Sequence, residues 1–351
     1  MLTPILSRAP TLSAAALLVV AAPLAAQQIT GYDPATGYQT GPGTGGYSDY
    51  SGTSTGSSFG NDSYSGNYGG GGGGFTTPNG FYLRGVVEAE LLVNRKDDER
   101  ILYGDISFGY APTGGGIGAD FGLVGYDTTT VDDLAVYGAV SFGLAGGRMQ
   151  VGAPRAVLDD FMDIPPVGGS RFLDIGFGQP TSSFVSAYAL TDGKTPYGLR
   201  YDTSMGALDL AGSVHQFGGD DVSAADLAAA YEFGAVTLSA GTEYVDGEGP
   251  SGFNMILGGK AEYGQMEGGL YYSTLRRPGD IEAWTAYGTW RPSEPISVTG
   301  SVVTAREAGD EATLYGLSAE YTIPQGAYVQ GGILDGDGER TTYDVSVGWK
   351  F

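Results

Sequence analysis

Alternation of apolar and polar side chains with a period of two residues dominates most of this chain. In residues 81–94, Leu83 and Leu91 fall on one face of an extended strand, whereas Arg84 and Glu88 fall on the other. One face suits an apolar environment and the other suits water. The pattern therefore predicts β-strands with one wet side rather than helices.

The same pattern returns along the rest of the chain. We count sixteen segments, at 81–94, 100–111, 115–126, 132–144, 147–152, 197–203, 206–216, 223–233, 235–245, 252–263, 265–275, 280–291, 294–306, 311–322, 326–334 and 339–351. A membrane-spanning strand needs about 9–11 residues. The region after residue 79 is therefore long enough for sixteen such strands.

The connections between the segments fall into two alternating classes. Connections such as 95–100 and 335–340 are charged, whereas those between them, such as 145–147 and 263–265, are short and almost uncharged. A soluble two-sheet fold has no reason to sort its connections in this way, but a transmembrane barrel has long loops on one rim and tight turns on the other. The fold predicted is all-β, a 16-stranded antiparallel transmembrane β-barrel. Aromatic residues near strand ends, among them Tyr103, Trp284 and Trp349, are expected to form girdles at the membrane interfaces.

One connection breaks the rhythm. About forty residues, 153–196, separate the fifth predicted strand from the sixth, and they carry apolar residues interleaved with carboxylates. A loop of this length inside a compact domain is usually functional or disordered. Its anchors, such as Phe161 and Met162, favour a loop packed against a wall. We expect it to fold into the pore and narrow it.

The N-terminal part has a different composition. Residues 1–26 combine Arg8, an apolar core and a small-residue cleavage site, as in a secretory signal peptide. Residues 27–79 are rich in Gly, Tyr and Ser and are predicted to be a disordered extension. The barrel is assigned to 80–351. The chain has no Cys, and its 40 acidic and 17 basic residues give a net charge of −23, which argues against a nucleic-acid partner.

The last strand, YDVSVGWKF, alternates up to Phe351 and resembles the ending of Gram-negative general porins. The sixteen-strand count, the long connection after strand five and the GLRYD stretch at 198–202 are similar to the same family. The resemblance implies location in the cell outer membrane, among lipid and lipopolysaccharide, and assembly as a homotrimer. It also implies that the barrel assembly machinery reads the strand ending at Phe351. The extension and the DDFMD and PPVGG stretches depart from the family pattern.

In that family, carboxylates on the inserted loop face basic residues on the wall. The corresponding loop carboxylates here are Asp159, Asp160, Asp163 and Asp174. The wall residues are Arg84, Arg148 and Arg200, which face the inside of the barrel according to their positions in the alternating pattern. Structural salt bridges that pin the loop are an equally weighted interpretation of these residues. Arg155 and Arg171 could be ties within the loop.

These features predict a water-filled channel for passive diffusion of small hydrophilic solutes and ions, with a mild preference for cations. One alternative is a substrate-specific channel, in which an aromatic ladder along the pore would start at Tyr271 and Tyr287. The other is a non-conducting structural or adhesive barrel. No enzyme is expected, since the single histidine, His215, has no signature serine nearby. No cofactor is expected either, although acidic outer connections could bind Ca²⁺ or Mg²⁺ that bridges to lipopolysaccharide.

Overall fold

The computed structural model describes the chain from residue 75, with short gaps. The described residues are 75–77, 79–94, 98–112, 116–129, 132–162, 164–171, 183–219, 221–247, 251–275, 280–307, 310–337 and 341–351. The predicted signal peptide and almost all of the predicted extension lie outside them. Asp163 and Asp174, two of the predicted loop carboxylates, lie outside them as well.

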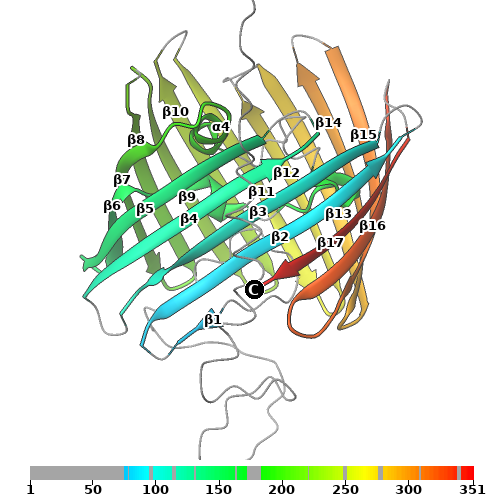
Figure 1. The fold of residues 1–351 in the computed structure, drawn as a ribbon, viewed down its shortest axis with the longest axis horizontal. Helices are drawn as coiled ribbons and strands as arrows, with labels where there is room; N and C mark the ends of the chain where they lie inside the picture. The colour runs from blue at the N-terminus through cyan, green and yellow to red at the C-terminus, as the bar shows by residue number, and fades with distance from the viewer. Residues whose placement is uncertain are drawn as a thin grey trace, which may run out of the picture. The chain divides into compact units, whose positions relative to one another are not determined.

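Strands make up most of the described chain (Figure 1). They are β1 (Phe75–Thr76), β2 (Phe81–Val93), β3 (Asp98–Tyr110), β4 (Ile117–Asp127), β5 (Asp132–Leu144), β6 (Gly147–Ala153), β7 (Pro196–Met205), β8 (Leu208–Phe217), β9 (Ser223–Phe233), β10 (Val236–Asp246), β11 (Gly252–Tyr263), β12 (Met266–Leu275), β13 (Ile281–Ser293), β14 (Ile296–Glu307), β15 (Asp310–Thr322), β16 (Ala327–Gly336) and β17 (Thr342–Lys350). Each of the sixteen predicted segments coincides with one of β2–β17, with bounds that differ by three residues or fewer.

The sheet closes on itself. Each strand from β2 onward pairs antiparallel with the next, and β17 pairs back onto β2, with Val345 opposite Leu91. The described residues thus form a closed, antiparallel sixteen-stranded barrel, as predicted from the sequence. Closure matters in a membrane because hydrocarbon offers no partner for an unpaired backbone N–H or C=O group.

The seam between the first and last barrel strands is sealed at the end of the chain. Gly85 and Phe351 exchange two backbone hydrogen bonds, of 2.6 and 3.0 Å. Beyond that point the short strand β1 takes over as the neighbour of β2, with Phe75 opposite Leu83. The last residues before the barrel therefore continue the sheet edge that β17 leaves.

Exposure is inverted relative to a soluble protein. Outward apolar side chains are open, with Leu227 60 % and Leu238 55 % exposed, whereas the inward Glu88 and Arg200 are each 2 % exposed. An apolar exterior of this kind matches the hydrocarbon of a bilayer. Among the described residues, no helix is long and apolar enough to span a membrane.

The aromatic prediction holds only in part. Trp284 and Trp349 are exposed, at 54 % and 36 %. Tyr103, however, lies on the inner face, where the guanidinium of Arg171 stands 5.1 Å from its ring centroid. Its neighbour across the strand pair is the buried Glu88. The assignment of Tyr103 to an interfacial girdle is wrong, because position near a strand end does not fix the face.

The described parts of the long connection between β6 and β7 include the helical elements α2 (Leu158–Phe161), the 3₁₀ turn η2 (Val167–Gly169) and α4 (Phe184–Thr191). In Figure 1, α4 is seen between the front and back walls of the barrel. We call residues 154–195 the inner loop.

Candidate pore-lining site

The inner loop is tied to the barrel wall at its root. The guanidinium of Arg155 forms an ion pair with Asp105 on β3, with an Nη1–Oδ2 distance of 3.0 Å, and it stands 5.3 Å from the ring of Tyr137 on β5. It lies flat over Gly122, where an added Cβ would be 2.8 Å from Nε. Arg155 therefore fastens the loop to the wall, a role that the expectation of an internal tie did not include.

The next part of the inner loop, residues 157–162, lies on the wall between β8 and β13. Val157, Leu158 and Met162 are buried against inward residues of β8, β9, β11, β12 and β13. Among the residues that they cover are Tyr271 and Tyr287, whose rings stack with centroids 6.5 Å apart. These two tyrosines, at 3 % and 7 % exposure, are core residues of the loop–wall contact. They do not begin an open aromatic ladder.

The 3₁₀ turn η2 then lies directly on the backbone of β15 and β16. Gly168 and Gly169 both have positive φ, of 63° and 84°. An added Cβ on Gly332 would lie 1.8 Å from the carbonyl oxygen of Gly168, and one on Gly316 would lie 2.1 Å from its nitrogen. Glycine on both sides is required for this contact. Beside it, Val167 is fully buried in an apolar cluster with residues of β13–β16.

The end of this stretch reaches the barrel seam. Ser170 Oγ donates a 2.6 Å hydrogen bond to Glu90 Oε1, and the backbone N–H of Arg171 donates to Glu90 Oε2 at 3.0 Å. The Arg171 side chain lies 3.6 Å from the carboxylate of Glu88. Arg171, like Arg155, thus pairs with a carboxylate of the wall.

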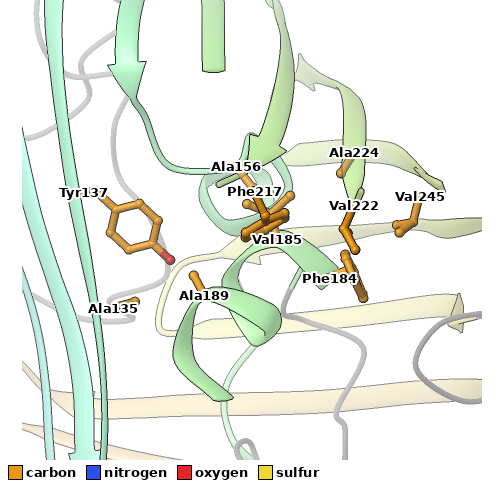
Figure 2. Close-up of a cluster of buried hydrophobic side chains, with 10 residues drawn as sticks. All are labelled: Ala135, Tyr137, Ala156, Phe184, Val185, Ala189, Phe217, Val222, Ala224 and Val245. Atoms are coloured by element: carbon orange, nitrogen blue, oxygen red, sulfur yellow. The ribbon is translucent and has the colours of Figure 1, made fainter. Parts of the chain in front are cut away.

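Helix α4 forms the last anchored part of the inner loop. Figure 2 shows Phe184, Val185 and Ala189 of α4 within a cluster of buried side chains from β5, β8, β9 and β10. Ser183 caps the helix by accepting from the N–H of Ser186. The carboxylate of Glu243 on β10, fully buried, accepts from the N–H groups of Phe184 at 2.8 Å and Val185 at 3.2 Å.

Taken in order, these contacts follow the inner wall almost all the way round. The inner loop touches β3 and β5 at Arg155, β8–β13 at α2, β14–β16 at η2 and β2 at Ser170. The wall from β8 to β16 is therefore lined by the loop. The wall from β2 to β7 carries most of the ionic side chains that line a cavity.

That cavity brings the three predicted wall residues together. Arg84, Arg148 and Arg200 all line it, along with Arg155 and the loop residue Asp160. The guanidinium of Arg84 stands 5.5 Å from the ring of Tyr82.

Carboxylates of the wall itself hold two of these arginines, Arg148 and Arg200. Arg148 binds Asp120 on β4 at 2.6 and 2.7 Å and Ser141 at 2.9 Å. Arg200 binds Asp202, two residues along its own strand, at 2.8 Å. Arg200 and Arg148 are thus parts of wall networks as well as lining residues.

The two described loop carboxylates behave differently. Asp160 faces the wall and forms an ion pair with Arg200, with an Nη1–Oδ2 distance of 2.5 Å. Asp159 turns away from the wall arginines: it accepts from the N–H of Ser183 at 3.0 Å and from the hydroxyl of Ser186. Enclosure by the protein raises the pKa of Asp159 to about 6. Adjacent positions in a helix point about 100° apart, so the two carboxylates could not both face the wall arginines.

Sequence reasoning missed the residues that receive the loop. Glu90 and Glu243 were indistinguishable from other inward polar residues, and Gly316 and Gly332 from the many other strand glycines. No local signal marks them, because their role depends on what lies across the bore.

The histidine environment argues against nucleophilic catalysis. His215 is buried, with Nε2 3.6 Å from Asp226 Oδ2, and Ser213 Oγ donates to that same oxygen at 2.7 Å. A catalytic triad places the histidine between the nucleophile and the acid. Here the aspartate stands between the serine and the histidine, so neither is activated.

Comparison with known proteins agrees with the fold. No family model matches the chain. A porin of Rhodobacter capsulatus is 26 % identical over 250 residues, covering 63 % of this chain and 81 % of that protein. A mutant of the Rh. blastica porin superposes with a TM-score of 0.57 at 17 % identity, covering 77 % of this chain and all of that one. A porin refined at 1.8 Å resolution gives a TM-score of 0.54 at 22 % identity over the same shares. The resemblance indicated by the last strand is confirmed: this chain is similar to porins and has the porin fold.

Proposed function

We propose that this protein is an outer-membrane porin, a water-filled channel for passive diffusion of small hydrophilic solutes and ions. The observation that carries the proposal is the closed sixteen-stranded barrel with an apolar exterior and charged side chains inside. A barrel of this strand number is wide enough for an aqueous channel, and an inserted loop then sets its narrowest part.

We further propose a mild preference for cations. The net charge of −23 supports it. So does the pairing of the lining arginines Arg148, Arg155 and Arg200 with carboxylates, because paired guanidinium groups attract anions less strongly.

Purified protein in planar bilayers tests both proposals. Large, unblocked conductance steps support a general diffusion channel, closure by added sugar would indicate a substrate-specific channel, and silence would indicate a structural barrel. In a salt gradient, the sign of the reversal potential reports selectivity, and anion preference would contradict the second proposal. Asp160→Asn is expected to move the reversal potential toward anions, whereas Asp335→Asn removes an exposed carboxylate near the end of β16 and measures the contribution of surface charge outside the cavity.

The remaining assignments follow from the same proposal. We propose a homotrimer in the outer membrane of a Gram-negative bacterium, in contact with lipid and lipopolysaccharide, and delivered through recognition of the strand ending at Phe351. We also propose that divalent cations bridge the acidic outer connections to lipopolysaccharide. Chemical cross-linking in native membranes should trap three copies.

A further inference from the structure

The inner loop meets the wall through two buried glutamates that serve the same purpose on different strands. Glu90 on β2 accepts from the Ser170 hydroxyl and the Arg171 N–H, and Glu243 on β10 accepts from the N–H groups of Phe184 and Val185. Glu90 is 4 % exposed and Glu243 is 0 % exposed. Both carboxylates accept hydrogen bonds from backbone N–H groups of the loop.

The two glutamates stand on opposite sides of the barrel. In the ring β2–β17, strands β2 and β10 are separated by eight steps in either direction. A fastening on β2 and another on β10 therefore hold the loop at two points that face each other across the bore. Displacement of either point changes the open cross-section, whereas two fastenings on neighbouring strands would allow the loop to swing.

The chemistry suits a firm anchor. Hydrogen bonds from N–H groups to a carboxylate are stronger than those to a neutral acceptor. At Glu243 the donors are the first N–H groups of α4, where the helix dipole also favours negative charge. Asn254 Nδ2 holds the carboxylate in place at 2.7 Å.

We propose that Glu90 and Glu243 are positioning residues that fix the inner loop, and hence the width and steadiness of the channel. This inference rests on the proposed channel function for its consequence, but its structural part can be tested without conduction. The natural chain has no Cys, so a single introduced cysteine reports the exposure of one site.

The test uses two reporters and three glutamate variants. Val185→Cys places the thiol in α4 and Val167→Cys places it in η2, and both valines are fully buried. Each reporter is combined with Glu243→Gln, Glu90→Gln and, as control, Glu320→Gln. Glu320 on β15 is an inward wall carboxylate that pairs with Lys350 on β17 at 2.7 Å. The control therefore removes a buried wall charge without releasing a loop anchor.

We expect Glu243→Gln to speed modification of Val185→Cys by a water-soluble maleimide by about tenfold, the change that loss of one charge-assisted hydrogen bond produces. Glu90→Gln should do the same for Val167→Cys, and each should leave the other reporter nearly unchanged. Equal labelling in all three glutamate variants, or none above the parent, overturns the proposal.

Conduction provides the second readout. Glu90→Gln and Glu243→Gln, without reporters, should raise open-channel current noise and lower the voltage at which channels close, with the double variant most affected. Glu320→Gln should change the heat stability of the folded barrel without these effects. If the wild type does not conduct, the proposed function fails while the labelling result still decides the anchoring. If it conducts and both variants are as quiet as the control, the positioning role fails.

Discussion

The two parts of the inner wall are built on different principles. From β8 to β16 the wall presents small and apolar side chains, such as Ala211, Ala228 and Ala283, and the inner loop buries them as a soluble protein buries its core. From β2 to β7 the wall presents guanidinium and carboxylate groups around a cavity, such as Arg148 with Asp120. The first part meets the loop mainly through apolar contacts, and the second meets it through ion pairs and hydrogen bonds, such as Arg155 with Asp105 and Ser170 with Glu90.

The difference shows that a residue facing the inside of this barrel need not be polar. Inward apolar residues mark where the loop lies, because burial of apolar surface contributes about 25 cal/mol per Å². Inward ion pairs made with the loop, such as Arg200 with Asp160, fix it at single points, and the attraction within each pair has to recover the cost of desolvation.

The largest effect is expected from Arg200, on the ionic part of the wall. Arg200→Met leaves Asp160 and Asp202 without their shared cation in a buried setting, which costs about 3–5 kcal/mol. The folded barrel should lose its compact form at a clearly lower temperature in detergent. Lys260→Met, which breaks a partly exposed pair with Glu262, is the control and should change little. Equal shifts for the two variants would contradict the distinction between buried and open pairs.

The apolar part of the wall is tested by Gly332→Ala. The added methyl would overlap the carbonyl of Gly168, and overpacking of this kind typically costs about 1–3 kcal/mol. Because the loop can move more easily than the barrel, we expect single-channel conductance to change while barrel heat stability falls only modestly. Gly143→Ala is the matched control, since no atom lies within 4 Å of its added Cβ. Unchanged conductance in Gly332→Ala would show that η2 does not lie on β16.

The smallest effect concerns pH and the junction between α2 and α4. Because burial raises the folded-state pKa of Asp159 to about 6 from its ordinary value of 3.8, the folded state binds its proton more tightly than the unfolded state. Its contribution to stability is therefore greatest at low pH and declines as pH rises from about 4 through 6, by on the order of 1 kcal/mol. Asp159→Asn should remove this part of the pH dependence. Thermal denaturation of both proteins at pH 4.5 and 7.5 measures it, and parallel pH profiles would count against the assignment.

Much of the barrel could be predicted from the sequence, but little of the loop's course could. Strands β5, β9 and β11 begin and end where the alternation places them, because side-chain direction in a strand depends only on parity. The inner loop has no such rule. Asp159 and Asp160 are adjacent and chemically identical. Asp159 nevertheless accepts hydrogen bonds from Ser183 and Ser186 at the start of α4, whereas Asp160 pairs with Arg200. Arg155 and Arg171 carry no sign in the sequence that their partners are Asp105 and Glu88.

The sequence alone determined the number of strands, the face that each residue occupies and the closure of the sheet, since these follow from a local period and from the need to pair every backbone group in lipid. Only the tertiary structure decided where the loop lies, which glycines make room for it and which glutamates hold it. Those contacts join residues from 58 positions apart (Glu243 and Val185) to 164 positions apart (Gly332 and Gly168), and their partners are selected by shape and burial across the bore rather than by anything in the neighbouring sequence.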